Sequence, residues 1–524
     1  MPAAGGIPGA GSVRIEQTPL VTTISRRSLI ALGAATVAGA SVGRWTPIVA
    51  GRAAASAGTG PFDGNPFALG VTSGDPDPTS AVLWTRLTRV DGSALDEPDT
   101  PVVWEVADNE EFRSAVSRGE VTAQADEGHC VHAVVDLAGP AYYRFTVGDW
   151  ISPVGRVAPT PSDPRELRIA AASCQHFESG FYAAHRDIAE WAPDLVVFLG
   201  DFIYEYATDA FGEDIVRSHD SDEVMVVGEY RDRYALYLSD ADLRASRGAC
   251  PWLVIWDDHE VENNYAGPVP EEVGAIAEFA TRRLAAYQAW WEHMPVRMAR
   301  PTSTDDFTIY RSVAWGELAD IILLDGRQYR TNQACGDVTL SLDPPCPVAS
   351  GPTRTMLGAV QEQWLADQLS STTAVWPVIA QQTVLTESTL NGAILNYDQW
   401  DGYAPARDRL LTAAQVADRA IVLTGDIHLA GVGLLPAVGV EFVTTSISSG
   451  GLVPDDLEGT VASLGNIVAA ERAHRGYTRH VVTEDGWTAE FRIVDDATVV
   501  DSPVSTWRTF VVDPLQRDVV TESA

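Results

Sequence analysis

Four apolar runs in this sequence each end in side chains of the types that bind metal ions in proteins. One run covers residues 195–199, and Asp201 and Tyr204 follow it closely. Continuous apolar runs are typical of strands buried on both faces of a parallel sheet, and ligands gather beyond the carboxyl ends of such strands. We therefore expect Asp201 and Tyr204 to lie at the carboxyl end of a buried strand.

The other three runs repeat this arrangement and add further ligand types. They are residues 167–172 before Cys174, residues 252–256 before Asp257 and Asp258, and residues 420–424 before Asp426 and His428. Carboxylates, an imidazole, a thiolate and a phenol at one edge of one sheet would form a mixed site for more than one cation. We expect all four strands to lie in that one sheet.

The ligand types suggest which ions the site holds. A site with two ions needs a ligand that bridges both, and Asp201 can take that position. Cys174 and Tyr204 favour a trivalent ion, because a phenol titrates at about 10 and loses its proton at neutral pH only beside a highly charged cation. Iron(III) is the expected ion. The remaining donors are oxygen atoms that suit Ca2+, Mn2+ or Mg2+, namely Asp258, Asn263 or Asn264, and Asp426.

Each of these segments also has an ordinary structural interpretation. Asp201 after a glycine can be a helix N-cap, Tyr204 can be a half-buried packing residue, and His428 can be a satisfied core histidine. Residues 257–260 can be a solvated run of charges, and they lack the second histidine of a zinc-protease helix. The coincidence of four such segments favours the metal site.

Composition limits the partners of this chain. Its 524 residues, 45% of them hydrophobic, are enough for a large core and for more than one domain. The 72 acidic residues outnumber the 36 basic ones, which gives a formal net charge of -36. A chain this acidic repels nucleic acid and anionic membrane surfaces, so we expect no nucleic-acid-binding surface. A phosphate ester would need local cations to reverse the field at the site.

The first residues have the features of an export signal. Arg26 and Arg27 precede a short apolar stretch of small residues, and Ala-x-Ala cleavage options follow at residues 53–57. We expect a twin-arginine signal over residues 1–57, with the twin-arginine export machinery as a partner and an extracellular, periplasmic or cell-wall location. An uncleaved membrane anchor is the alternative, but the stretch is shorter than a spanning helix. No stable membrane span is expected after processing.

The remaining chain divides into two expected domains. Residues 58–161 contain short runs of alternating polarity between glycines and prolines, which predicts an immunoglobulin- or fibronectin-like all-β sandwich. Residues 162–524 alternate strands with helices, the latter at 180–191, 230–243 and 271–291, which predicts an α/β domain with a parallel sheet. Cys335 and Cys346 bracket a proline-rich loop and are the expected disulfide among the five cysteines.

The segments after the apolar runs resemble the motif series of the alkaline phosphatase D (PhoD-like) family of metallophosphoesterases. They are Ser173-Cys174-Gln175, Gly200-Asp201-Phe202-Ile203-Tyr204-Glu205, residues 256–264, residues 324–330, and Gly425-Asp426-Ile427-His428. The resemblance covers nearly the whole mature chain. It implies a metallophosphoesterase-like β-sandwich core flanked by helices, after an N-terminal all-β domain, and a distant relationship to purple acid phosphatases.

The resemblance also implies a ligand set. Iron would be bound by the residues that match the family's iron ligands, namely Cys174, Asp201, Tyr204 and His428. Calcium would be shared among Asp201, Asp258, Asn264 and Asp426, and Mn2+ or Mg2+ can take its place. The adjacent pairs Asp257/Asp258 and Asn263/Asn264 leave alternative registers open.

The expected mechanism is an in-line attack on phosphorus by metal-activated hydroxide, with the second ion and His259 stabilising the phosphoryl oxygens. Arg327, or else Arg231 or Arg233 of the expected helix, is the candidate clamp on a non-bridging oxygen. The expected catalytic residues are therefore His259, Asp201 and Arg327.

The leading interpretation is an exported alkaline phosphatase for phosphate monoesters and also diesters, including small-molecule, phospholipid and nucleotide esters. The alternative is a phosphodiesterase of the phospholipase D type, which a wide site lined by aromatics such as Trp400 and Tyr403 would favour. A non-catalytic, calcium-stabilised surface protein is the third and least favoured hypothesis, because such a site needs no Cys, Tyr or His. Whether residues 507–524 cover the site as a lid stays open, as does the oligomeric state.

Overall fold

The computed structural model describes residues 62–113, 115–212, 215–271, 276–336, 342–417, 419–451, 459, 463–516 and 520–522. The expected export signal over residues 1–57 lies outside the described residues. Within the described ranges, no helix has both the length and the apolar character that crossing a membrane requires.

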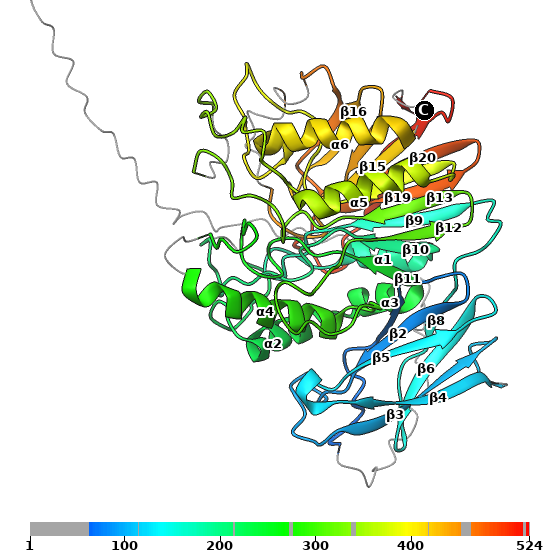
Figure 1. Cartoon of the computed structure of the whole chain (residues 1–524). Helices are drawn as coiled ribbons and strands as arrows, with labels where there is room; N and C mark the ends of the chain where they lie inside the picture. The colour runs from blue at the N-terminus through cyan, green and yellow to red at the C-terminus, as the bar shows by residue number, and fades with distance from the viewer. Residues whose placement is uncertain are drawn as a thin grey trace, which may run out of the picture. The chain divides into compact units, whose positions relative to one another are not determined.

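More of the described residues lie in strands than in helices (Figure 1). In chain order they are β1 (Val71–Gly74), β2 (Ser80–Arg86), β3 (Thr100–Ala107), β4 (Ala115–Ala123), β5 (Cys130–Asp136), β6 (Ala141–Val147), β7 (Trp150–Ile151), β8 (Gly155–Val157), β9 (Leu167–Ala172), β10 (Leu195–Phe198), β11 (Pro251–Val254), β12 (Arg311–Trp315), β13 (Ala319–Leu323), β14 (Trp376–Ala380), β15 (Ala420–Thr424), β16 (Ala430–Leu435), β17 (Gly439–Val443), β18 (Ile467–Glu471), β19 (Arg475–Thr483), β20 (Gly486–Val494), β21 (Val504–Val512) and β22 (Val520–Glu522). They form a 10-stranded sheet in the order β22-β21-β20-β19-β9-β10-β11-β1-β2-β5, a 7-stranded sheet in the order β12-β13-β14-β15-β17-β16-β18, and a 5-stranded sheet in the order β4-β3-β6-β7 with β8 beside β6.

The helices flank these sheets. They are α1 (Ala183–Trp191), α2 (Val227–Leu238), α3 (Ala241–Ala249), α4 (Ile276–His293), α5 (Gly358–Ser371) and α6 (Ala404–Ala417), with short 3-10 turns η1 (Ala125–Glu127) and η3 (Trp400–Tyr403). The single helix expected over residues 230–243 is instead α2 and α3. The chain breaks there because Asp240 caps α3, its carboxylate accepting from the backbone N–H of Asp242 at 2.9 Å and of Leu243 at 3.1 Å.

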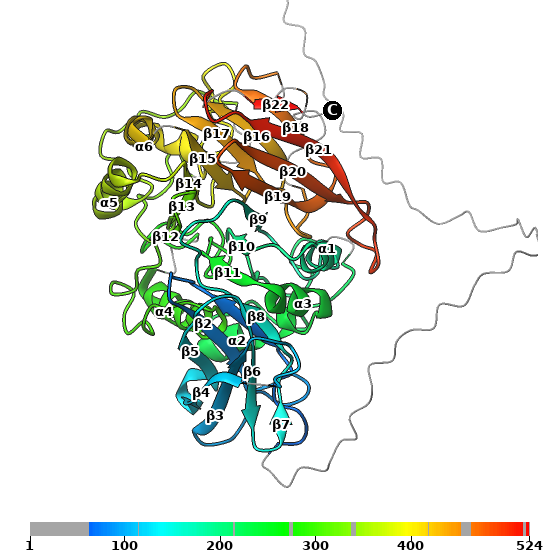
Figure 2. The same cartoon turned by 90° about the vertical axis from the view of Figure 1, so that its right-hand side faces the viewer.

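The two large sheets pack face to face and share one core. Phe442 of β17 contacts His480 of β19, with ring centroids 5.5 Å apart, and Trp376 of β14 contacts Trp487 of β20 at 5.8 Å. The opposite face of the 7-stranded sheet carries Ile322, which packs in a second cluster beneath α5 and α6. Figure 2 shows α5 and α6 on one side of this sandwich and α1 and α3 on the other. The architecture is the mixed α/β sandwich with flanking helices that we expected.

The expected N-terminal sandwich shares a sheet with the rest of the molecule. β1, β2 and β5 pack against the 5-stranded sheet, with Leu83 and Val131 facing Val102 and Phe145 in a separate core. β1 also pairs in parallel with β11, Ser73 opposite Pro251. This pairing satisfies the N–H and C=O groups that would otherwise leave β11 as a sheet edge. The 10-stranded sheet is therefore continuous across the domain boundary expected at residues 161 and 162.

The prediction that all four ligand-bearing strands lie in one sheet is wrong. β9, β10 and β11 are adjacent and parallel in the 10-stranded sheet, whereas β15 lies between β14 and β17 in the 7-stranded sheet. The sheets meet beyond these strand ends, where Ser173 bridges Ser446 and the N–H of Ile447 donates to the Ser173 carbonyl at 2.9 Å. An apolar run predicts a buried strand but does not specify which sheet contains it.

Other expectations about the chain have clear outcomes. Cys335 and Cys346 form the predicted disulfide, and Cys130, Cys174 and Cys250 are free and buried. Residues 504–512 form β21, which pairs with β20 at one end of the 10-stranded sheet. This strand is part of the sheet, so the segment is not folded over the strand ends as a lid.

Candidate metal centre

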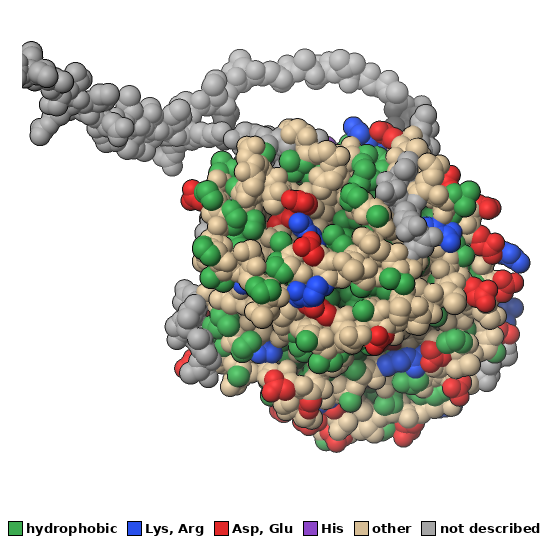
Figure 3. Space-filling model, turned by 45° about the horizontal axis from the view of Figure 1, so that its top comes forward, with side chains coloured by type: hydrophobic (Ala, Val, Ile, Leu, Met, Phe, Trp, Pro, Cys, Tyr) green, Lys and Arg blue, Asp and Glu red, His purple; other side chains and the backbone are tan. Residues whose placement is uncertain are grey.

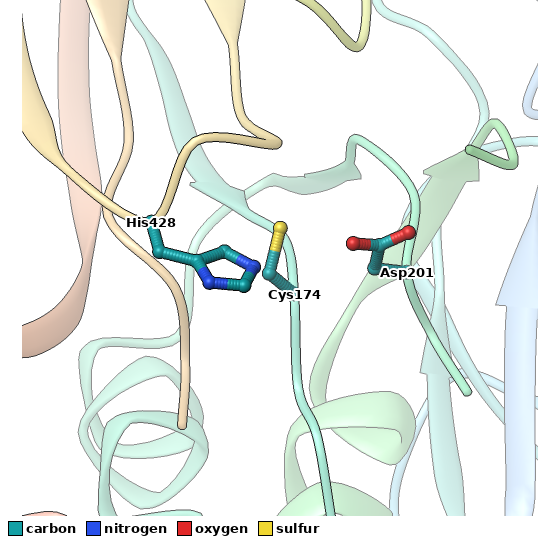
Figure 4. Close-up of side chains that lie close together, drawn as sticks. All are labelled: Cys174, Asp201 and His428. Carbon is teal, nitrogen blue, oxygen red and sulfur yellow. The ribbon is translucent and has the colours of Figure 1, made fainter. Parts of the chain in front are cut away.

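The carboxyl ends of β9, β10 and β15 bring three expected ligands together. One donor atom each of Cys174, Asp201 and His428 lies within 4.8 Å of the other two. In Figure 4, Cys174 lies between His428 and Asp201, and each residue comes from a different segment of the chain. Asp201 also belongs to a second group of the same kind, with Asp258 and His259. A residue common to two groups is what a bridging ligand requires.

Tyr204 joins the first group through its hydroxyl. The hydroxyl donates to Asp201 Oδ2 at 2.9 Å and lies 3.1 Å from His428 Nε2. It also accepts from Ser449 Oγ at 2.8 Å. The side chain is buried, with 3% of its surface exposed. The structure thus gathers all four side chains that were expected to bind iron.

The ligand loops have an unusual backbone. Five of the expected ligands have φ in the left-handed region that residues other than glycine rarely adopt: Cys174 (58°), Asp201 (57°), Asn264 (52°), Asp426 (66°) and His428 (55°). Such conformations persist where the surrounding structure enforces them, and they concentrate at functional sites.

Two glycines permit the close approach of these loops. Gly200 has φ 110°, and a Cβ there would lie 2.6 Å from the backbone nitrogen of Asp257. A Cβ on Gly425 would lie 2.4 Å from Ser173 Oγ, at the junction of the two sheets. Any larger residue at either position would push apart strand ends that must meet to form the site.

Buried hydrogen-bond acceptors hold the loops that carry the expected ligands. Glu260 accepts backbone N–H bonds from Asp201 at 3.0 Å, from Phe202 at 2.5 Å and from Asp257 at 2.8 Å. His428 donates from Nδ1 to the Gly450 carbonyl, which leaves Nε2 as the free nitrogen beside Tyr204. The ligand atoms are therefore oriented by groups that do not themselves bind the ion.

The electrostatics of the first group favour a bound cation. Burial, with the nearby Asp201 carboxylate as a second cause, raises the pKa values of Cys174 and Tyr204 well above their usual range. Burial likewise raises the pKa of Asp201, whereas it lowers the pKa of His428 to about 3 and so keeps this imidazole neutral. The anionic donors are thus unfavourable without a positive partner, and the neutral imidazole suits coordination.

Buried carboxylate oxygens without hydrogen bonds also favour a bound cation at this site. Among the described residues, Asp201 Oδ1 is buried and makes no hydrogen bond, and Asp258 Oδ1, also without a hydrogen bond, has an ion-pair contact with Arg327 at 3.3 Å. Buried carboxylate oxygens are normally paired, and those that are not call for an ion or a similar partner. The donor set of thiolate, phenolate, imidazole and shared carboxylate fits a trivalent ion, and the oxygen donors beside it fit a divalent one.

The oxygen donors gather around Asp258. Asp257, Asp258 and Asp426 form another group with donor atoms within 4.8 Å of one another. Asp258 Oδ2 accepts from the Asn264 backbone N–H at 2.7 Å, and both Asn263 and Asn264 line the adjacent pocket. Asp258 lines that pocket as well, whereas the fully buried Asp257 does not. Of the two registers left open by the sequence, the one with Asp258 therefore faces the pocket.

Arg327 lies behind the carboxylates and does not line the pocket. It is fully buried, and its guanidinium donates to Asp257, to both oxygens of Asp398 at 3.0 and 2.9 Å, and to Asp426 Oδ1 at 2.8 Å. An ion-pair contact of 3.3 Å joins Arg327 to a fourth carboxylate, that of Asp258. With its nitrogens used in this way, Arg327 orients ligand carboxylates, and the structure does not bring it to a phosphoryl oxygen.

The other two candidate clamps are also occupied elsewhere. Arg231 forms an ion pair with Glu292, and Arg233 donates to the Tyr204 carbonyl and to Ser221 Oγ. Neither arginine lines the pocket. Both side chains serve instead to attach α2 to its neighbours.

His259 is placed as expected for a group that contacts substrate. Its ring stacks on Tyr204 at 4.1 Å, and Nδ1 donates to Glu205 Oε2 at 2.8 Å. Burial lowers the pKa of His259, but the nearby carboxylates, Glu205 first, hold this pKa well above its usual value. A cationic imidazole with Nδ1 fixed has Nε2–H available for a phosphoryl oxygen.

Most of the expected ligands, together with His259, border one pocket of about 430 Å3, whereas Cys174 is not among its lining residues. Its described lining residues are His176, Ser179, Asp201, Tyr204, Tyr206, Phe211, Asp258, His259, Asn263, Asn264, Glu271, Asn396, Asp398, Asp426, His428, Ser449, Gly450 and Gly451. Trp400 and Tyr403 would favour the diesterase alternative if they lined a wide site, but both are buried in the core beneath α5 and α6. Their polar atoms bond to Gln381 and to the Thr331 carbonyl.

Several residues that build the site were not identified from the sequence. Ser449, Glu260 and Glu205 act through backbone groups or through another side chain, so their types alone carry no signal of metal binding. Glu205 and Glu260 do lie within the motifs that resemble the family, which is the only indication available for them. Ser449 and Asp398 lie outside those motifs and are found only in the folded structure.

Comparisons with known proteins identify the family of this chain. A family model described as PhoD-like phosphatase matches residues 169–491, and a model for the N-terminal domain of PhoD-like phosphatases matches residues 52–161. The chain is similar to "Alkaline phosphatase D" of Bacillus subtilis (strain 168), with 39% identity over 515 residues, covering 93% of this chain and 88% of that protein. A solved structure described as "Structure of PhoD" matches with a TM-score of 0.83 and 38% identity, covering 88% of this chain and 93% of the other.

Proposed function

Because the chain belongs to the PhoD-like phosphatase family and is a phosphoric ester hydrolase, we propose that it is an exported two-metal phosphatase for phosphate monoesters and also diesters. The observation that carries this proposal is the group formed by Cys174, Asp201 and His428, with Tyr204 bonded into it; Asp201, Tyr204 and His428 line one pocket, and Cys174 is buried. We assign Fe3+ to these four residues.

The second ion belongs on the oxygen side of the site. We assign Ca2+ to Asp201, Asp258, Asn264 and Asp426, with Mn2+ or Mg2+ as substitutes. The unsatisfied Oδ1 of Asp201 and the gathering of Asp258 with Asp426 support this choice. Arg327 and Glu260 hold these carboxylates and their loops in place, and we regard both as positioning residues.

The chemistry follows from the residues around these ions. When bound, the two cations would polarise the phosphoryl oxygens and lower the pKa of water enough for hydroxide to attack phosphorus at alkaline pH. His259, oriented by Glu205, donates from Nε2 to a phosphoryl oxygen as negative charge develops there. The surrounding carboxylates repel a phosphate ester when the cations are absent, so activity should depend strictly on metal.

A comparison of two substrates tests this proposal. Hydrolysis of p-nitrophenyl phosphate and of bis(p-nitrophenyl) phosphate would be measured at alkaline pH, each with and without a chelator, together with the metal content of the protein. We expect chelator-sensitive hydrolysis with the monoester cleaved faster, and iron and calcium in the active protein. Metal-replete protein that cleaves neither ester would contradict the proposal.

Faster cleavage of the diester would instead favour the phospholipase D type of phosphodiesterase with the same ligands. The aromatic residues on which that alternative depended, Trp400 and Tyr403, do not line the pocket, so we keep the monoesterase as the leading proposal. Export through the twin-arginine machinery rests on residues 1–57 alone. Its test is whether Arg26→Lys together with Arg27→Lys retains the protein in the cytoplasm.

A further inference from the structure

One wall of the pocket is made of aromatic rings in contact with one another. Tyr206 and Phe211 meet edge to face with centroids 4.7 Å apart, and Phe211 lies 6.3 Å from the ring of His176. Tyr206 also contacts His259 at 5.1 Å. All four residues line the pocket, and Phe211 at its rim is 58% exposed. The ring wall, which we define as Tyr206, Phe211 and His176, thus extends from the expected reaction centre to the surface.

The loop that carries this wall is anchored to a buried carboxylate. Glu178 is 1% exposed and accepts the backbone N–H of Asp209 at 3.0 Å and of His219 at 2.8 Å, while its own carbonyl accepts from Val216 at 2.9 Å. The loop also closes on itself, since the N–H of Thr208 donates to the Ser221 carbonyl at 3.0 Å. Phe211 is therefore presented by a loop that is attached on both sides.

His176, Glu178 and His219 have donor atoms close enough to suggest another metal site. Their hydrogen bonds argue for an anchor instead. His219 uses Nδ1 with the Tyr206 carbonyl at 3.2 Å and Nε2 with the Tyr237 hydroxyl at 3.0 Å. With both ring nitrogens of His219 and both oxygens of Glu178 engaged, this cluster serves to hold the ring wall.

The charged residues of the pocket indicate that the ring wall is the main contact for the organic part of a substrate. The described lining residues include five carboxylates, from Asp201, Asp258, Glu271, Asp398 and Asp426, and no arginine. The chain has no lysine, so its 36 basic residues are all arginine. Figure 3 shows acidic side chains spread over one face of the molecule among arginines and small hydrophobic groups. Because no arginine is among the described lining residues, an anionic organic group would find no guanidinium partner in this pocket.

We propose that the ring wall is a subsite that binds a planar aromatic organic group of the phosphate ester, in contact with the rings of Phe211 and Tyr206. This inference rests on the proposed function, because it takes the phosphoryl group to lie at the metal centre. A contact between two aromatic rings contributes about 0.5–1.5 kcal/mol of binding free energy in addition to the contribution of the buried area. An aryl group should therefore bind about fivefold more tightly than a small alkyl group.

Two phosphonates that differ only in their organic group allow its contribution to binding to be measured without hydrolysis. Phenylphosphonate and methylphosphonate carry the same anionic group and are not hydrolysed, and calorimetric titration of the metal-loaded full chain gives Kd for each. We expect the wild type to favour phenylphosphonate about fivefold or more. Phe211→Ala should reduce this preference to about twofold or less, and Phe211→Leu, which keeps an apolar side chain without a ring, should fall between.

Phe112→Ala is the matched control, because Phe112 lies in the N-terminal β region and does not line the pocket. It should leave the preference unchanged. Equal Kd values for the two phosphonates in the wild type, or an unchanged preference in Phe211→Ala, would overturn the subsite while leaving the phosphatase proposal intact. If neither phosphonate binds to the metal-loaded chain, the proposed phosphate site is wrong and the subsite falls with it.

Discussion

Ser449 offers a sharp test of how the metal centre is held, because its hydroxyl joins three parts of the site. Ser449 Oγ accepts from the backbone N–H of His176 at 3.0 Å, and its single hydroxyl hydrogen is shared between the Cys174 carbonyl and the Tyr204 hydroxyl oxygen, both 2.8 Å away. The side chain is 1% exposed, so its hydrogen-bond partners are largely shielded from bulk water. Ser449→Ala therefore removes a connection between two expected ligands.

The size of the effect follows from these bonds. An orphaned buried N–H costs about 1–3 kcal/mol, and the lost bond to the Cys174 carbonyl adds about 0.5–1.5 kcal/mol. That carbonyl keeps two longer contacts, at 3.4 Å from the N–H of Ser448 and 3.3 Å from that of Ser449. We expect Ser449→Ala to lower the free energy of unfolding of the metal-free protein by about 2–4 kcal/mol.

The neighbouring Ser448 provides a matched control. Its hydroxyl is also buried and donates at 2.8 Å, but only to the His176 carbonyl, and it touches none of the expected ligands. Ser448→Ala should lower the free energy of unfolding by about 1 kcal/mol. Urea unfolding of both variants without metal measures the difference.

A second measurement on the same variants reports the ligand itself. The hydrogen bond from Ser449 favours the phenolate form of Tyr204, against the burial that raises its pKa. In iron-loaded protein, removing a donor from a phenolate raises the energy of its filled orbitals. We therefore expect the tyrosinate-to-iron absorption band to move to longer wavelength in Ser449→Ala and to stay in place in Ser448→Ala. If both variants unfold at the same urea concentration and keep the same band, Ser449 does not have this role.

Three further predictions follow from other parts of the structure. Tyr204→Phe should abolish the tyrosinate-to-iron band in iron-loaded protein, and a band that persists would remove Tyr204 from the ligands. Replacing Cys335 and Cys346 together by serine should lower the free energy of unfolding by about 3 kcal/mol without changing metal content, as measured by denaturant titration and elemental analysis. Truncation after Ser505 deletes most of β21, including the buried Phe510, so it should destabilise the fold by about 3 kcal/mol or more; higher activity on bulky substrates would revive the lid hypothesis.

Much of the fold was predictable because the relevant signals are local. A buried parallel strand needs a continuous apolar run, so the strands before Cys174, Asp201 and Asp426 were located from the sequence. The disulfide was predictable for a similar reason, since Cys335 and Cys346 are close in the chain. The break between α2 and α3 was missed because Asp240 has the residue type of many surface positions, and its capping role depends on local geometry.

The sequence by itself determined the chemistry of the centre. The kinds of donor atoms and their positions after apolar runs already indicate a thiol, a phenol, an imidazole and shared carboxylates, and residue type is a property of the chain alone. Only the tertiary structure decided how these donors are held. Two separate sheets supply them, Ser449 and Glu260 orient them, and Arg327 pairs with the carboxylates behind the pocket. These features depend on distances between segments far apart in sequence, which folding sets through packing and buried hydrogen bonds.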